Sequence, residues 1–160
     1  MILVLISILG LCAGSFALAM TVRMYDGRDW VKDRSECDLC HKKLKWYDLL
    51  PLISWLSTAG KCRYCHKKIG KLYPVIELGT GLAFGISYIY WPYGFTKAGI
   101  AIFALWLVML TLMASLLIFD VKWYILPDKI VYTLIGLAGV SKLFQVLYYQ
   151  DFSRLPGLGL

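Results

Sequence analysis

The sequence predicts an all-α membrane protein with about four transmembrane helices and one small polar loop between the first two helices. Apolar residues make up 59% of the 160 residues, and the mean hydropathy is +0.65. This composition excludes a disordered chain and is too apolar for a soluble domain of this length. Long uncharged runs recur along the chain. The positive charge is concentrated in one segment, since 12 of the 17 Lys and Arg residues lie between Arg23 and Lys71.

The first transmembrane helix is expected over residues 1–22, which carry no charge. About 20 apolar residues in a helix cross the hydrocarbon core of a bilayer, so this run is long enough to span it. A cleaved signal peptide is the competing interpretation. The run lacks the basic start that such peptides carry, which favours a retained helix.

Three further helices are expected downstream of the polar loop. Residues 73–91 form the second, with Glu77 as the one charge near its start. Residues 98–120 form the third and are uncharged up to the final aspartate. Residues 130–149 form the fourth, and residues 150–160 are interpreted as a tail at which the protein is truncated.

The position of the basic residues predicts the topology. Loops rich in Lys and Arg stay in the cytoplasm, so the loop over residues 23–72 is expected inside and the N-terminus outside. The positive charge, +7 overall, then serves orientation and contact with the lipid bilayer before any other partner. We therefore expect no nucleic-acid binding.

The loop contains a repeat with metal-ligand spacing. Cys37 and Cys40 open one copy of Cys-x-x-Cys-His-Lys-Lys, and Cys62 and Cys65 open the other. The 21 residues between the pairs slightly exceed the usual separation in structural zinc sites. Four thiolates bind Zn²⁺ tetrahedrally, and metal binding can supply the folding energy that a loop this short lacks. The sequence thus predicts a zinc site at the four cysteines.

Other roles for the cysteines compete with zinc. Disulfides need an oxidising compartment, and a redox Cys-x-x-Cys normally accompanies a βαβ pattern. Cys-x-x-Cys-His also attaches c-type haem, which makes a membrane-anchored dihaem cytochrome the sharpest alternative. That haem is attached outside the cytoplasm, and His41 and His66, the two histidines, both lie inside the motifs. We interpret them as loop residues beside the metal.

Two acids lie near the end of the third helix. Asp120 ends the uncharged run, and Asp128 follows eight positions later, after Pro127. A carboxyl group at this depth can mark the membrane interface, or its pKa can be raised toward the range of a general acid or base. Asp128 can equally open the next helix, where an acid is favoured by the helix dipole. Glu77 can serve as an interface anchor or as a partner for Lys71.

Taken together, these segments resemble the N-terminal region of bacterial type IV prepilin peptidases. The resemblance covers roughly residues 10–135. It rests on the order of several motifs, which are Gly14-Ser15-Phe16, Arg23, the two cysteine pairs, Trp46 to Leu56, Tyr73-Pro74-Val75-Ile76-Glu77-Leu78, and Phe119-Asp120 through Leu126-Pro127-Asp128.

The resemblance implies an integral-membrane aspartic endopeptidase of the bacterial inner membrane. Such enzymes cleave the leader peptides of type IV prepilins and pseudopilins after Gly at the cytoplasmic face. Many also methylate the new N-terminus with S-adenosylmethionine, a function associated with the zinc loop. By motif position, Asp120 corresponds to the first catalytic aspartate. Glu77, Asp128 and Arg23 correspond to residues that support the motifs or the substrate, and Asp128 is not expected to be catalytic.

The chain departs from the family pattern in one respect. The second catalytic aspartate belongs to a Gly-x-Gly-Asp motif, and Gly157-Leu158-Gly159 is followed instead by Leu160. We therefore interpret the chain as a fragment that cannot cleave prepilin alone. The alternative functions are a non-catalytic membrane zinc module that binds pilins or scaffolds a pilus or secretion machine, and the dihaem cytochrome.

Overall fold

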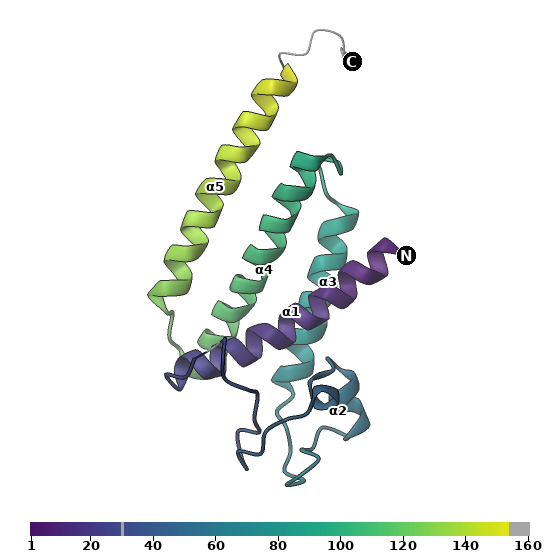
Figure 1. The fold of residues 1–160 in the computed structure, drawn as a ribbon, viewed down its shortest axis with the longest axis vertical. Coiled ribbons are helices and arrows are strands. Elements are labelled where there is room, and N and C mark those ends of the chain that lie inside the picture. The colour runs from purple at the N-terminus through teal and green to yellow at the C-terminus, as the bar shows by residue number, and fades with distance from the viewer. Residues whose placement is uncertain (30, 154–160) are drawn as a thin grey trace.

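Four long helices dominate the fold (Figure 1). The computed structural model describes residues 1–29 and 31–153, and their side chains as far as residue 147. The long helices are α1 (Ile2–Tyr25), α3 (Leu72–Ile89), α4 (Lys97–Trp123) and α5 (Asp128–Ser153). A 3₁₀ turn, η1 (Trp46–Leu49), and the short helix α2 (Ile53–Ser57) lie in the loop between α1 and α3. No strand occurs among the described residues, so the predicted all-α class is confirmed.

All four long helices can cross a bilayer by length and composition, with α5 counted as far as Leu147. At about 1.5 Å per residue, even the 18 residues of α3 extend roughly 27 Å, close to the thickness of the hydrocarbon core. Between 11% and 33% of the most apolar window of each helix is buried inside the molecule. The remaining apolar surface is what lipid tails would cover.

Helices α1 and α3 pack closely because glycines line their contact. A Cβ atom added to Gly10 would lie 2.7 Å from the carbonyl oxygen of Thr80. One added to Gly14 would lie 2.9 Å from the Cα atom of Glu77 and would overlap the hydroxyl of Thr80. Only glycine therefore allows the two backbones to approach to this distance, as small residues do at helix contacts in membranes.

Helix α4 packs against this pair and α5 packs mainly against α4. Thr96 caps α4, since its side-chain oxygen accepts a hydrogen bond from the backbone N–H of Gly99 at 3.2 Å. Two buried clusters join the helices. The first consists of Ala17, Leu18, Ile76 and Ile118, and the second of Met20, Phe119 and Ile130.

The cysteine loop and the C-terminal end of α4 lie at the same end of the bundle (Figure 1). Tyr25, the last residue of α1, stacks on Trp123, the last residue of α4, with 4.1 Å between the ring centroids. Tyr124 then ends α4 in the left-handed conformation, with φ of 56°. Asp120, in the last turn of α4, therefore lies at the same end of the bundle as the loop.

Candidate functional site

The two Cys-x-x-Cys-His-Lys-Lys copies fold alike, and we call residues 37–43 and 62–68 the first and second knuckle. The N–H of Cys37 donates to the carbonyl of Lys42 at 3.0 Å, and the N–H of Cys62 donates to that of Lys67 at 2.9 Å. His41 and His66 both take the left-handed conformation, with φ of 54° and 56°. The sequence repeat is thus a structural repeat, in which each backbone turn points two thiols the same way.

The four thiols of the knuckles converge on one point. The sulfur atoms of Cys37, Cys40, Cys62 and Cys65 all lie within 4.8 Å of one another, and none is in a disulfide. Sulfur atoms bound to one tetrahedral zinc ion at 2.3 Å would lie about 3.8 Å apart. A small contraction of the cluster therefore gives the geometry of a structural zinc site.

The electrostatics of the thiols fit a site that exchanges protons for a metal. Burial raises the pKa of the Cys37 thiol to about 12. Burial also acts to raise the pKa of Cys62, but the backbone N–H groups of Cys65 and Tyr64 and two neighbouring thiols outweigh it and lower this pKa to about 7. The shifts therefore favour a thiolate at Cys62 beside a protonated Cys37, and a divalent metal would displace the proton of Cys37.

The histidines lie outside the thiol cluster. His41 is exposed, and its Nδ1 atom lies 3.6 Å from a carboxylate oxygen of Glu36. His66 is exposed as well. The group of described residues that could hold a metal contains the four cysteines alone. This arrangement agrees with the interpretation of both histidines as loop residues.

Asp48 lies in the segment that connects the two knuckles, and it attaches this segment to the second knuckle. The sequence did not reveal this role. Its carboxylate accepts hydrogen bonds from Arg63 Nε at 3.0 Å, from the hydroxyl of Tyr64 at 2.9 Å and from the backbone N–H of Lys45 at 3.1 Å. The hydrogen bond to Asp48 raises the pKa of Tyr64 to about 12. A single acid in an aromatic segment, Trp46-Tyr47-Asp48, is the one sequence signal for it.

Glu77 attaches the same connection to α3. Its side chain is buried, with 7% of its surface exposed, and it accepts a hydrogen bond from the backbone N–H of Leu52 at 2.8 Å. Leu52 has φ of 58° and directly precedes α2. Glu77 therefore pairs with a loop backbone group rather than with Lys71, and this hydrogen bond connects the loop to α3.

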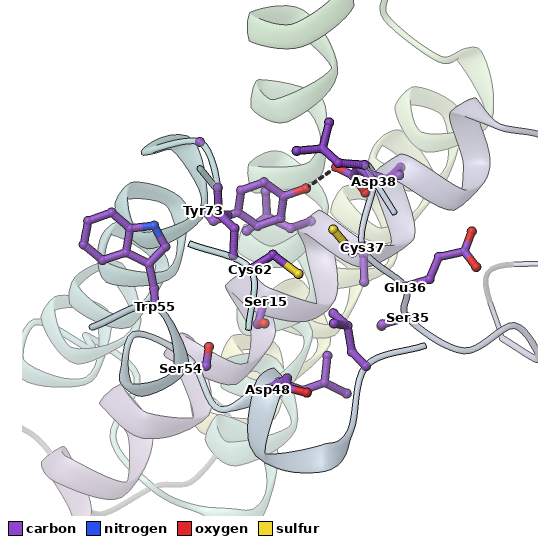
Figure 2. Close-up of a pocket in the computed structure, with 18 of the residues that line it drawn as sticks. Ser15, Ser35, Glu36, Cys37, Asp38, Asp48, Ser54, Trp55, Cys62 and Tyr73 are labelled. Carbon is purple, nitrogen blue, oxygen red and sulfur yellow. Dashed lines mark hydrogen bonds between the residues drawn. The ribbon is translucent and has the colours of Figure 1, made fainter. Parts of the chain in front are cut away.

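A second contact attaches the first knuckle to α3. The hydroxyl of Tyr73, in the first turn of α3, donates a hydrogen bond to Asp38 at 2.8 Å (Figure 2). Asp38 lies between Cys37 and Cys40. Arg23, near the end of α1, donates to the hydroxyl of Ser35 at 2.8 Å, just before the first knuckle. Loop and helices are thus joined on the α1 side and on the α3 side.

A cavity of about 640 Å³ lies between α1, the knuckles and the start of α3 (Figure 2). Its walls include Cys37 and Cys62, apolar residues of α1 such as Phe16 and Val22, and charged residues of the loop. The indole N–H of Trp55 is buried in this wall and has no hydrogen-bond partner among the described residues. Cavities of this volume are typical of small-molecule sites.

The structure does not bring the two aspartates into the cysteine centre. Asp120 is exposed on the last turn of α4, and its carbonyl accepts the N–H of Tyr124 at 3.0 Å. Asp128 is exposed at the first position of α5. Lys122, two residues after Asp120, lines the cavity, whereas neither aspartate is among the cavity residues.

Comparison with known proteins gives a family for this arrangement. The family model described as the bacterial peptidase A24 N-terminal domain matches residues 8–91, which is slightly more than half of the chain. The matched region runs from α1 through both knuckles to the end of α3. No solved structure matches the chain.

Several curated proteins are similar over longer stretches. A prepilin leader peptidase/N-methyltransferase of Myxococcus xanthus is 35% identical over 146 residues, which is 89% of this chain and 41% of that protein. One of Pseudomonas aeruginosa is 36% identical over 122 residues, covering 76% of this chain and 40% of its own length. A type 4 prepilin-like proteins leader peptide-processing enzyme of Escherichia coli O78:H11 is 39% identical over 95 residues.

The chain spans 41%, 40% and 33% of the length of these three relatives. The match to the family model nevertheless includes the whole cysteine loop and the two helices on which it is seated. The chain belongs to the family of bacterial A24 peptidase N-terminal domains.

Proposed function

We propose that the chain is part of a type IV prepilin peptidase, an aspartic endopeptidase that removes leader peptides of prepilins or pseudopilins after Gly at the cytoplasmic face of the inner membrane. The observation that carries this proposal is the position of Asp120. The similarity to proteins named prepilin leader peptidase/N-methyltransferase supports it, because the match to the first of them covers 89% of the chain.

The charge distribution supports the cytoplasmic side. The loop end of the bundle carries the 12 basic residues between Arg23 and Lys71 together with Lys122 and Lys129. The opposite end carries Lys97 at the start of α4. Basic residues are retained in the cytoplasm, so the loop and Asp120 would both face it. A leader peptide that emerges from the membrane there could reach the Asp120 carboxylate.

The chemistry proposed for Asp120 is general acid–base catalysis. Two carboxyl groups that share a proton allow one to activate water while the other protonates the departing amine. Asp120 would supply one of these groups from the last turn of α4, where its side chain is exposed. The second group would come from a Gly-x-Gly-Asp motif, which the 160 residues do not contain. We therefore expect no cleavage of prepilin by this chain on its own.

Zinc fits the four cysteines because thiolates are its preferred structural ligands and the sulfurs already converge. Bound zinc would supply structure rather than chemistry, since four protein ligands leave no open position. Cys37, Cys40, Cys62 and Cys65 would hold it, and Asp48 and Glu77 would keep the surrounding loop on the helices.

S-adenosylmethionine fits the cavity by size and by the groups in its wall. The donor would supply a methyl group to the new N-terminal amine. The cavity offers the indole N–H of Trp55, which no described residue accepts, the aromatic ring of Tyr64 and acidic side chains such as Glu36. These residues could bind and orient an adenosine and an amino-acid group beside the membrane.

A non-catalytic zinc module is the second candidate. It is favoured by the contrast between four cysteines whose sulfurs converge and an Asp120 that is exposed outside the cavity. The convergence of all four sulfurs on one point speaks for one metal and against two separate haem groups, which would each need one cysteine pair.

A chimera distinguishes the peptidase from the module. This chain would replace the matched portion of the Pseudomonas aeruginosa relative, to which it is 36% identical. The chimera should cleave prepilin, and Asp120→Asn should lower kcat by a factor on the order of 10²–10⁴, as expected for loss of a catalytic acid or base. Asp128→Asn, the matched control, should retain activity. A membrane-inserted, zinc-loaded chimera without cleavage would favour the module.

A further inference from the structure

The contact between the first knuckle and α3 continues to α4. The hydroxyl of Tyr73 donates to Asp38 at 2.8 Å. The ammonium group of Lys122 lies 5.8 Å from the centroid of the Tyr73 ring, within cation–π range. Three elements that are distant in sequence thus meet at one aromatic side chain.

Lys122 is also held from its own helix. Its ammonium lies 4.7 Å from the ring centroid of Trp123, which stacks on Tyr25 at the end of α1. Trp123 and Tyr73 both pack against the buried cluster that contains Ala17 and Ile118. Trp123 therefore fixes the last turn of α4 against the buried cluster. Lys122, in the same turn, depends on the Tyr73 ring for one of its two cation–π contacts.

From this geometry we propose that Tyr73 is a positioning residue that couples metal binding at the cysteines to the conformation of the last turn of α4, which carries Asp120. The functional meaning of this coupling rests on the proposed function, but the coupling itself does not. Cys37 and Cys40 would hold one side of a bound zinc ion, and this would fix the backbone between them and with it the carboxylate of Asp38. Asp38 fixes the Tyr73 ring, and the ring face restrains Lys122, two residues beyond Asp120.

The structure offers a matched control for this coupling. Tyr64 also donates its hydroxyl to an aspartate, Asp48, at 2.9 Å. That contact joins two parts of the loop, whereas the Tyr73 contact joins the loop to α3. Tyr73→Phe and Tyr64→Phe each remove one Tyr–Asp hydrogen bond, and only the first interrupts the connection to α4.

The test measures hydrogen–deuterium exchange of the backbone amides of Val121–Tyr124 in the purified chain in nanodiscs, with zinc bound and after chelation. Zinc content is measured for every variant. In the parent chain and in Tyr64→Phe, zinc should slow exchange of these amides about threefold to tenfold, which corresponds to the net worth of roughly one hydrogen bond. In Tyr73→Phe, zinc should still bind while this protection is lost.

Equal protection by zinc in all three chains would overturn the role of Tyr73, and no protection in the parent chain would overturn the coupling. Lys122→Met keeps the test decisive should Tyr73→Phe fail to fold, because it removes the other end of the contact without touching the loop. It should bind zinc and lose the protection, and full protection in it would also overturn the proposal. The readout is exchange rather than cleavage, so an inactive chimera would leave this result unaffected.

Discussion

Glu77 of α3 accepts a hydrogen bond from the backbone N–H of Leu52 at 2.8 Å, across the boundary between membrane helix and loop. Leu52 has the positive φ of 58°. The carboxylate therefore accepts a hydrogen bond from a backbone N–H that lies just before α2, at a residue with positive φ. Removal of this acceptor should loosen the loop where it is seated on α3.

We predict that Glu77→Ala destabilises the seating of the loop by about 1–3 kcal/mol, because it leaves the N–H of Leu52 without a partner. Limited trypsin digestion in nanodiscs measures this as faster cleavage at the loop lysines. Glu77→Gln keeps an acceptor oxygen and should cleave at nearly the parental rate. If Glu77→Ala resists trypsin as well as the parent chain does, this hydrogen bond does not hold the loop.

Metal content should depend on four of the five cysteines. Cys62→Ser should abolish stoichiometric zinc, since Cys62 is buried and its thiol pKa is lowered to about 7, which favours the thiolate that binds the metal. Cys12→Ser should retain one zinc ion per chain, because Cys12 is exposed on α1 and lies outside the cluster. Elemental analysis of the purified chains gives both values. Zinc retained in Cys62→Ser would contradict the four-thiolate site.

Zinc binding should release protons in a pH-dependent number. The pKa of Cys62 is lowered to about 7, so its thiol binds a proton at pH 6 and has largely lost it at pH 8. The pKa of Cys37 is raised to about 12, so its proton must be displaced at either pH. Between pH 6 and pH 8, the number released should fall by about one, and zinc affinity should rise with pH throughout. Calorimetry in buffers of different ionisation enthalpy counts these protons, and a count that stays constant over this range would contradict the assignment.

The contact between α1 and α3 should tolerate no added methyl group at Gly14. Gly14→Ala should destabilise the helix pair by roughly 1–3 kcal/mol, because the new Cβ would overlap Thr80 and approach Glu77. Gly136→Ala is the matched control on α5, where a Cβ would meet nothing within 4 Å, and it should be neutral or mildly stabilising. Reversible unfolding in mixed micelles measures both. If Gly14→Ala leaves the free energy of unfolding unchanged, α1 and α3 can move apart to accommodate the methyl group without loss of stability.

The predicted fold class and the metal cluster follow from local patterns. The uncharged runs give the four long helices, and the repeated cysteine motif gives the four ligands whose sulfurs converge. Both signals lie within short stretches of sequence, where a periodic pattern or a ligand spacing has a direct structural meaning. Glu77 stood out for the same reason, as an acid in an apolar helix.

The seating of the loop could not be predicted, because it depends on pairs that are distant in sequence. Asp38 and Tyr73 are 35 residues apart, and Leu52 and Glu77 are 25 apart. In sequence, an aspartate in a basic loop is indistinguishable from a solvated charge, and a tyrosine at a membrane edge from an interfacial anchor. The helix α2 was missed as well, because five residues are too few for a periodic signal.

The roles of Asp120 and Asp128 stay predictions. Position at the end of an apolar run identifies an acid near the membrane face, and the structure leaves both side chains exposed. Among the described residues, neither carboxylate has a hydrogen-bond or ion-pair partner that would distinguish a catalytic carboxyl group from an interfacial one. That distinction needs the variants described above.

The knuckles and the glycine contact close two nested rings in one chain. The inner ring joins the two cysteine pairs across 21 residues, and the outer ring joins α1 to α3 around the whole loop. Once one ring is closed, the chain loses less conformational entropy when the other ring closes. The contact between α1 and α3 thus raises the effective concentration of one knuckle at the other. Metal binding and the association of α1 with α3 are therefore thermodynamically coupled. Metal binding should strengthen this association by the same free energy by which the association strengthens metal binding.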